Sequence, residues 1–184
     1  MNPRRNQDAT QEAISLSEVK DHLRITGTAD NAELRTLIAG IRHETEKYLG
    51  RTLVSTTWEL ILDAFTDEIV LPMPPVTAIN SISYVDTDGV TQTFSDYQFD
   101  RKGRLLPSYG NEWPQTRDQL GAVTIIYTAG DAHAGLVPPD IKLAMLLAIG
   151  SREICREDLI VGTTVSQLPN GSKAMLHPHR EVAL

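Results

Sequence analysis

The chain has little of what disulfide-bonded, exported or membrane-embedded proteins need. Its 184 residues include a single cysteine, Cys155, which cannot form an intramolecular disulfide bond and fits a reducing compartment. The N-terminal segment carries two arginines with no apolar stretch behind them, so no secretory signal is predicted. No apolar run approaches the roughly 20 residues that cross a bilayer. We therefore expect one globular domain of the cytoplasm, without a membrane partner.

Motifs for cofactors and metals are also missing. The chain contains none of the glycine-rich nucleotide-binding patterns and no Gly-x-Ser-x-Gly elbow. His43 lacks the second histidine that a zinc-protease helix requires, and His177 and His179 have too few further ligands around them for zinc. Residues 86–89 share two acids and a glycine with a calcium loop, but the other required carboxylates are missing, so a tight turn is the better interpretation. We predict no metal and no cofactor.

Acid–base catalysis is left with one candidate pair. Asp131 and His133 lie close together in a predicted loop, where they could exchange a proton. Any small protein offers such a pair by chance, so we predict that the chain is not an enzyme. A small hydrolase that uses these two residues stays an alternative.

Negative charge is in excess. The chain has 24 Asp and Glu against 17 Lys and Arg, a formal net charge of -7, and no cluster of basic residues. Phosphate binding needs such clusters, so the chain is not expected to bind nucleic acid tightly.

Helical periodicity marks both ends of the chain. Ser15 and Glu18 form a predicted capping box before a short helix that ends at Gly27. A second predicted box, Asp30 with Glu33, precedes a longer amphipathic helix that ends at Gly50. The outer face of this second helix is predicted to be charged: Glu33, Arg35, Arg42, Glu44, Glu46 and Lys47. A third helix, residues 138–157, is apolar around most of its circumference, which predicts a core helix covered on several sides.

Between the helices the period of the apolar residues changes to two. This pattern predicts strands, and the turn at residues 86–89 predicts a hairpin whose return strand reaches Tyr97. The predicted strands are residues 56–63, 69–71, 79–85, 91–97, 104–106 and 122–128.

The predicted fold class is α+β: a small bundle of three main helices with an inserted antiparallel β subdomain and an extended C-terminal tail. The expected parts are a flexible N-terminus (1–13), a helical part (14–56), the β subdomain (57–128), the core helix (129–158) and a docking tail (159–184). The tail has too few apolar residues for a core of its own. We therefore expect it to bind a partner and to be dispensable for the stability of the rest.

Short motifs follow one another in a recognisable order along the chain. They are Tyr48-Leu49-Gly50-Arg51, Trp58, Leu71-Pro72, Pro75-Val76, Ile82-x-Tyr84-x-Asp86-x-Asp88-Gly89, Tyr97, Trp113-Pro114, Tyr127-Thr-Ala-Gly130, Val137-Pro138, Arg152-Glu153, Leu168-Pro169, Leu176, Pro178 and Arg180. This order resembles the head-tail connector, or head-completion, proteins of tailed bacteriophages and gene-transfer agents. The chain departs from the family pattern at Ile149-Gly150-Ser151, where an aromatic residue and an asparagine usually stand.

The resemblance implies a structural adaptor of the virion, assembled in the bacterial host cytoplasm. Such a protein forms a ring of about twelve copies under the portal, links the DNA-filled head to the tail and extends the DNA channel. The implied partners are the portal protein, the tail or next connector, and further copies of the chain, while DNA passes without specific binding. The implied contacts with the portal or a neighbouring subunit are Leu168, Pro169, Met175, Leu176, Pro178 and Arg180. A non-viral cytoplasmic binding module stays the main alternative.

Overall fold

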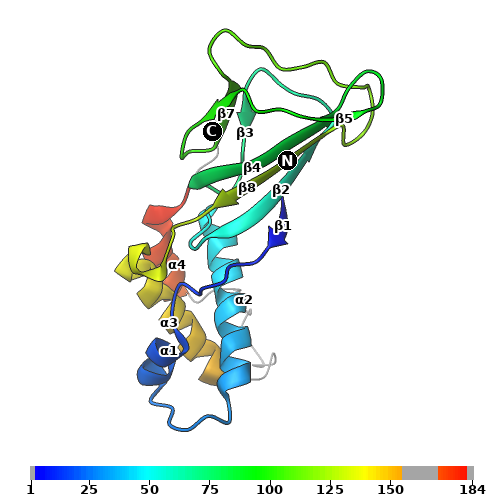
Figure 1. The fold of residues 1–184 in the computed structure, drawn as a ribbon. Helices are drawn as coiled ribbons and strands as arrows, with labels where there is room; N and C mark the ends of the chain where they lie inside the picture. The colour runs from blue at the N-terminus through cyan, green and yellow to red at the C-terminus, as the bar shows by residue number, and fades with distance from the viewer. Residues whose placement is uncertain (1–2, 155–169, 182–184) are drawn as a thin grey trace, which may run out of the picture. The chain divides into compact units, whose positions relative to one another are not determined.

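The computed structural model describes residues 3–154 and 170–181, and the chain divides into two compact units (Figure 1). Met1–Thr10 and Val54–Asp131 form the β unit, and Gln11–Leu53 and Ala132–Leu184 form the helical unit. The predicted α+β class, with an antiparallel β part inserted into a helical part, is confirmed. The insertion is three residues wider at each end than residues 57–128.

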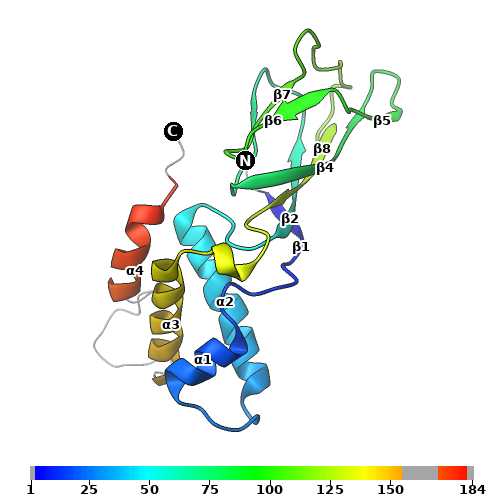
Figure 2. The same ribbon diagram turned by 60° about the vertical axis from the view of Figure 1, so that its left-hand side comes forward.

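The helical unit is built around α3 (Pro139–Ile154), the predicted core helix. The long helix α2 (Asn31–Leu49), the short helix α1 (Leu16–Leu23) and α4 (Asn170–Leu176) all pack against it (Figure 2). Two single turns of 3-10 helix, η1 (Ala134–Leu136) and η2 (His177–His179), precede α3 and follow α4. The buried apolar residues of the unit are Ala13, Ile14, Val19, Leu34, Ile38, Ile41, Leu49, Leu53, Val137, Ile141, Ala144, Met145, Ala148, Ile149 and Leu176.

The two predicted capping boxes have different outcomes. The Ser15 side chain accepts the Glu18 backbone N–H at 3.1 Å, and the Glu18 carboxylate accepts the Ser15 N–H at 2.7 Å, which confirms the first box. The second box is wrong, because the Asp30 side chain makes no capping hydrogen bond. The backbone of Asp30 has φ -92° and ψ 6° rather than the extended conformation that directs a capping side chain toward the helix.

The β unit contains two antiparallel sheets. The larger has the strand order β1-β2-β8-β4-β5 and the smaller the order β3-β7-β6. The predicted hairpin is confirmed, since β4 pairs with β5 through the turn after Val85, but Tyr97 belongs to β6 of the smaller sheet rather than to the return strand. The strands are β1 (Arg4–Gln7), β2 (Thr56–Leu62), β3 (Ile69–Val70), β4 (Val76–Val85), β5 (Thr91–Thr93), β6 (Tyr97–Phe99), β7 (Arg104–Pro107) and β8 (Val123–Ala129).

Residues of both sheets form one apolar core. Alternate residues of β2 and β8 point into it, as expected for half-buried strands. The Tyr127 hydroxyl donates a hydrogen bond to the Pro72 carbonyl at 2.7 Å, and burial raises the pKa of this phenol. Partly buried aromatic rings close one side of the core, where Phe65 stacks on Trp113 with ring centroids 4.6 Å apart.

The N-terminal segment differs from the predicted flexible terminus. Residues Arg4–Gln7 form β1, which pairs with β2 at one edge of the larger sheet. The Arg5 guanidinium lies 4.9 Å from the centroid of the Trp58 ring, and Arg4 forms an ion pair with Glu59 at 2.7 Å. The polar composition of the segment suggested mobility, but its two arginines bind side chains of β2.

Candidate assembly surfaces

Residues 170–181, the described part of the segment where the sequence predicts partner contacts, belong to the helical unit. Leu176 is fully buried, and α4 packs against α3 and α2. Leu176 therefore packs inside the helical unit, and the predicted dispensability of the tail for stability stays a prediction. The segment has few apolar residues of its own. Helices α3 and α2 supply the apolar side chains around Leu176.

Hydrogen bonds and ring contacts also hold this segment. The Glu181 N–H donates to the Leu49 carbonyl at 2.8 Å, and the Arg180 guanidinium lies 5.8 Å from the centroid of the Tyr48 ring. The His179 ring contacts the Asp140 carboxylate at the start of α3, and this hydrogen bond lowers the pKa of Asp140.

The remaining predicted contacts keep their status as predictions. Met175 is half-buried, and Pro178 and Arg180 are exposed. Leu168 and Pro169 lie outside the described residues.

A buried ionic network is the feature that sequence reasoning missed. Arg42 and Glu46 are both fully buried, although the sequence placed them on an exposed charged face. Arg42 Nε donates to Glu12 at 2.7 Å and Arg42 Nη1 to Glu46 at 3.3 Å, while the Leu53 N–H donates to Glu46 at 2.9 Å. Arg42 and Glu46 are opposite in charge, four residues apart and adjacent to the apolar seam of α2. This spacing could have indicated an ion pair on the helix.

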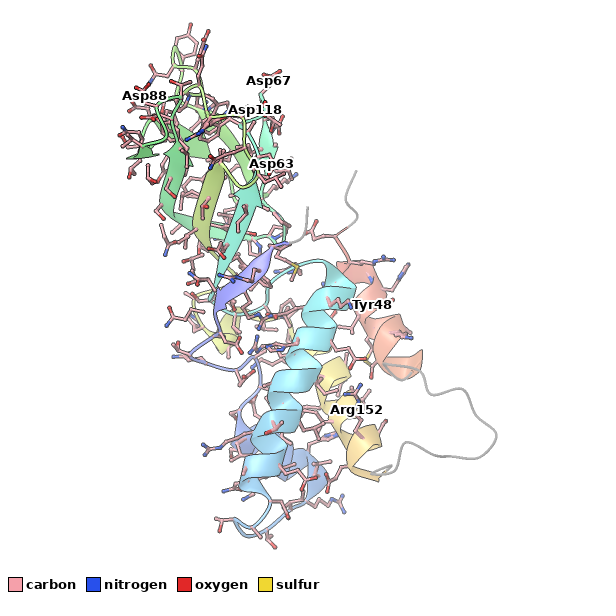
Figure 3. The ribbon with its side chains drawn as sticks, turned by 90° about the vertical axis from the view of Figure 1, so that its right-hand side faces the viewer. Tyr48, Asp63, Asp67, Asp88, Asp118 and Arg152 are labelled. Atoms are coloured by element: carbon pink, nitrogen blue, oxygen red, sulfur yellow. The ribbon has the colours of Figure 1, made fainter. Side chains whose placement is uncertain are left out.

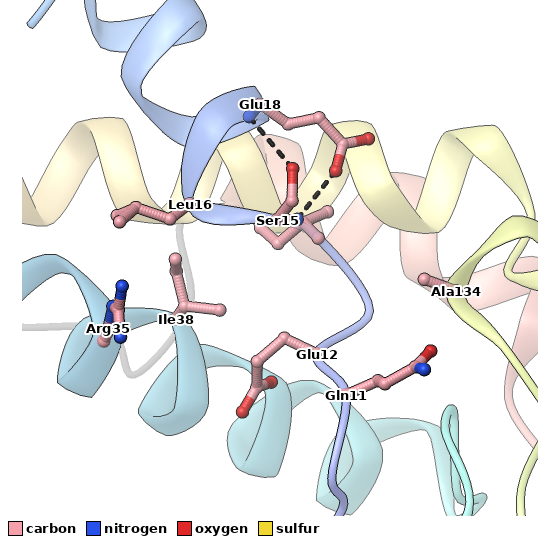
Figure 4. A pocket seen from close by; sticks show the side chains of 9 residues that line it. Gln11, Glu12, Ser15, Leu16, Glu18, Arg35, Ile38 and Ala134 are labelled. Carbon is pink, nitrogen blue, oxygen red and sulfur yellow. Dashed lines mark hydrogen bonds between the residues drawn. The ribbon is translucent and has the colours of Figure 1, made fainter.

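A pocket of about 550 Å³ opens in the helical unit between the start of α1, α2 and η1 (Figure 4). Its apolar lining consists of Ile14, Leu16, Ile38 and Ala134, and its charged residues are Glu12, Glu18 and Arg35. Figure 4 places Arg35 at one side, Gln11 and Ala134 at the other, and Glu12 between them. Arg35 is exposed and forms no ion pair with any residue of the described ranges.

The β unit carries most of the net negative charge of the chain. It has twelve Asp and Glu against six Arg and Lys, a net charge of -6, whereas the helical unit has twelve against eleven. The acids gather at one end of the larger sheet, because β2 and β4 end there and β5 and β8 begin there. Figure 3 shows Asp63, Asp67, Asp88 and Asp118 at this end. Such a surface repels the phosphates of nucleic acid.

The two residues of the candidate catalytic pair belong to different units, Asp131 to the β unit and His133 to the helical unit. Asp131 forms an ion pair with Arg101 at 3.4 Å, and His133 is exposed.

The carboxylate of Asp86 accepts the N–H groups of Asp88 and Val90 and so holds the β4–β5 turn, which confirms the interpretation of residues 86–89 as a tight turn.

In the described part of the chain, no group of three or more His, Cys, Asp or Glu could hold a metal ion. None of its helices combines the length and the apolar composition of a membrane span.

A profile of the head completion protein family matches residues 12–182. The chain belongs to this family. The predicted family is thereby confirmed, and with it the predicted class of virion structural protein at the connection between head and tail. A comparison of this head completion protein with curated protein sequences gives no match.

Three solved structures contain chains similar to this head completion protein at 25% identity, and each alignment covers 100% of this chain and 97% of the other. The first is the neck of an empty gene-transfer agent (GTA) particle computed with C6 symmetry, with a TM-score of 0.80. The second is the virion of a native GTA particle, with a TM-score of 0.79. The third is the neck of a native GTA particle computed with C12 symmetry, with a TM-score of 0.72.

Proposed function

We propose that this head completion protein is an adaptor that forms a ring under the portal, links the DNA-filled head to the tail and extends the DNA channel. The observation that carries the proposal is the full-length likeness, with a TM-score of 0.80, to a chain of a GTA particle neck. Neck structures computed with C6 and C12 symmetry support a closed ring of copies.

The charge distribution supports passage of DNA through the ring. The β unit has a net charge of -6, and seven of its acids lie in the segments at the end of the larger sheet where β2 and β4 end: Asp63, Asp67, Glu68, Asp86, Asp88, Glu112 and Asp118. Double-stranded DNA carries one phosphate charge per roughly 1.7 Å of helix. Basic residues would attract these phosphates and slow the DNA, whereas acidic residues repel them and allow it to pass. We therefore propose that the chain guides DNA without binding it.

Attachment to the portal is proposed for the exposed part of the C-terminal segment. Pro178 and Arg180 lie at the surface of the helical unit, where η2 ends. Arginine and proline side chains in this position can contact a partner without disturbing the buried Leu176.

Particle assembly without the chain tests the proposed function. A producing cell that lacks this protein should accumulate DNA-filled heads without tails, and the purified protein added to such heads should restore tail attachment. Electron microscopy of complete particles that carry a tagged chain should place the tag at the neck. Tailed particles made without the chain, or complete particles that lack the tag, would overturn the proposal.

A further inference from the structure

A long connection in the β unit contains neither helix nor strand. The β7–β8 loop, defined here as residues 108–122, runs from the end of β7 to the start of β8. Connections of more than about 12 residues without secondary structure are uncommon in compact units, and they are usually either binding loops or mobile segments. The contacts that the loop makes with the rest of the β unit distinguish these two possibilities.

The β7–β8 loop is attached to the β unit along its length. Three of its backbone N–H groups donate hydrogen bonds to residues outside it, and one of its rings is stacked: Ser108 N–H to the Asp96 carbonyl at 2.8 Å, Arg117 N–H to the Val85 carbonyl at 3.0 Å, Gly121 N–H to the Asp63 carboxylate at 2.7 Å, and Trp113 on Phe65 with centroids 4.6 Å apart. The loop is therefore a fixed part of the unit. A partner that binds a fixed loop loses little affinity to the cost of ordering it.

This fixed loop exposes two large side chains. Tyr109 and Leu120 are 102% and 88% exposed, more than any other large apolar residue in the described part of the chain. Tyr109 follows β7 and Leu120 precedes β8, so the loop presents one of them near each of its ends. Tyrosine is enriched among the residues that contribute most to binding between proteins. A fixed loop that holds a tyrosine and a leucine in water is typical of a protein-binding surface.

Negative charge without counter-charge lies beside the loop and on it. Figure 3 shows Asp63, Asp67, Asp88 and Asp118 at this end of the larger sheet. None of these four forms an ion pair with a residue of the described ranges. A partner that covers the loop must therefore tolerate or neutralise several carboxylates.

We infer that the β7–β8 loop binds a different protein of the particle, through a surface on that protein that is basic around apolar pockets. Tyr109 and Leu120 enter the pockets, and the aspartates face the basic residues. The inference rests on the proposed function, because an adaptor needs a contact on the tail side as well as the portal side. It assigns the tail-side contact to this loop.

Charge decides which occupant fits the loop. DNA is repelled by the aspartates. A second copy of the chain is a poor match, because its β unit has the same net charge of -6 and its helical unit is nearly neutral, with twelve acids against eleven bases. A basic protein surface is attracted instead, and opposite charges orient its approach and raise the rate of association. Aspartates that the partner leaves uncovered still repel DNA.

Removal of the two anchors is the main test. Tyr109→Ser and Leu120→Ser are combined in one anchor variant, and both side chains are exposed, so the fold should be unchanged. DNA-filled heads and tails, both purified from a producing cell that lacks the chain, are mixed with the native protein or with the variant. The variant should bind heads as the native chain does. Half-maximal tail attachment should require at least about 30-fold more tails, the effect of losing a hot-spot contact. Sedimentation measures binding to heads, and electron microscopy counts the tailed particles.

Reversal of one charge tests the basic character of the partner. Asp118 is exposed and lies on the loop, so Asp118→Lys leaves both anchors in place. This variant should attach tails several-fold more slowly than the native chain at low salt. The difference should shrink at high salt, because dissolved ions screen charges at the surface.

Matched substitutions in the helical unit provide the controls. Leu136→Ser changes a leucine that is 54% exposed, and Asp21→Lys reverses an exposed acid of α1. Both control variants should attach tails as the native chain does. Melting curves identify any variant that fails to fold, and tryptophan fluorescence reports whether Trp113 keeps its place in the loop.

The outcomes separate this inference from the proposed function. A folded anchor variant that attaches tails as well as the native chain would overturn the inference and leave the adaptor function in place. A variant that no longer binds heads would show that the loop contacts the portal or another copy, which also overturns it. Tail attachment by Asp118→Lys that equals the native rate at every salt concentration would refute the basic partner. A native chain that neither binds heads nor restores tails would refute the proposed function itself.

Discussion

The two units of the molecule differ in how their interiors are filled. The core of the β unit consists of aliphatic and aromatic side chains, with the Tyr127 hydroxyl bonded to a backbone carbonyl. The helical unit buries a complete ion pair, Arg42 with Glu46, beside its apolar residues. Burial of two charges costs several kcal/mol unless partners satisfy them, so the helical unit depends on geometry that the β unit does not need.

The network joins helix α2 to two chain segments outside it, the one before α1 and the one after α2. Glu12 lies in the segment that leads into α1, and the Leu53 N–H lies at the end of the segment that follows α2. Both segments border the inserted β unit in the sequence. The buried charges thus specify where the helical unit begins and ends, which apolar contacts alone would leave less defined.

The largest expected effect comes from breaking this network. Arg42→Met keeps the length of the side chain but removes its charge, which leaves Glu46 buried without its cation. We expect a loss of about 3–5 kcal/mol in the free energy of unfolding. Urea unfolding followed by far-UV circular dichroism, which reports mainly on helices, measures it.

Lys47→Met is the matched control on the same helix. Lys47 is exposed, so its replacement should change stability by about 0.5 kcal/mol or less. A loss below about 1 kcal/mol for Arg42→Met would mean that the buried network contributes little and that the two interiors are energetically alike.

A cavity in the β unit should have a slightly smaller effect. Ile125 of β8 is fully buried, and Ile125→Ala is expected to cost about 2–4 kcal/mol from lost burial and an incompletely filled space. The two tryptophans of the chain, Trp58 and Trp113, both belong to the β unit, so their fluorescence reports the unfolding of this unit. Ile126→Ala, a change on the partly exposed face of the same strand, is the control.

Comparison of the two variants sharpens the contrast between the units. Arg42→Met should lower the transition seen by circular dichroism most, and Ile125→Ala the one seen by fluorescence. Equal shifts of both signals in both variants would show that the units unfold as one, and the difference between their interiors would then have no separate consequence for stability.

Sequence reasoning identified the elements whose signal is local. The periods of 3.6 and 2, the Ser15–Glu18 box and the turn after Val85 are decided by neighbouring residues, and the structure has them as predicted. The core role of α3 followed from its composition. These signals also sufficed for the fold class and, through the order of motifs, for the family.

The wrong predictions share a physical cause. At each of these positions the structure depends on residues that are distant in the sequence. Arg42 and Glu46 can be buried because Glu12, 30 residues before Arg42, accepts from Arg42, and the Leu53 N–H donates to Glu46. Strand β1 exists because Trp58 and Glu59 bind its arginines. A polar or sparse segment looks mobile when it is read alone. Its partners appear only in the folded chain.

The smallest expected effect concerns the response of the helical unit to acid. The Ser15 backbone N–H, bonded to the Glu18 carboxylate at 2.7 Å, lowers the pKa of Glu18 from its ordinary 4.5. A carboxyl with a lowered pKa stabilises the fold above the unfolded value, and this contribution disappears as the pH falls through the folded value. The Glu18 side chain is 46% exposed, so solvent screening limits the contribution to about 0.5 kcal/mol or less.

Glu18→Gln should therefore be slightly less stable than the native chain at pH 7, and the difference should shrink as the pH falls through the lowered pKa of Glu18. Glu33→Gln is the control, because Glu33 holds the same position in α2, where the Asp30 side chain forms no capping hydrogen bond. Its stability should follow the native pH curve. Melting temperatures measured from pH 7 to pH 3 decide the matter: if Glu33→Gln loses as much as Glu18→Gln, a general charge effect at helix starts, rather than the capping box, sets the acid response of the helical unit.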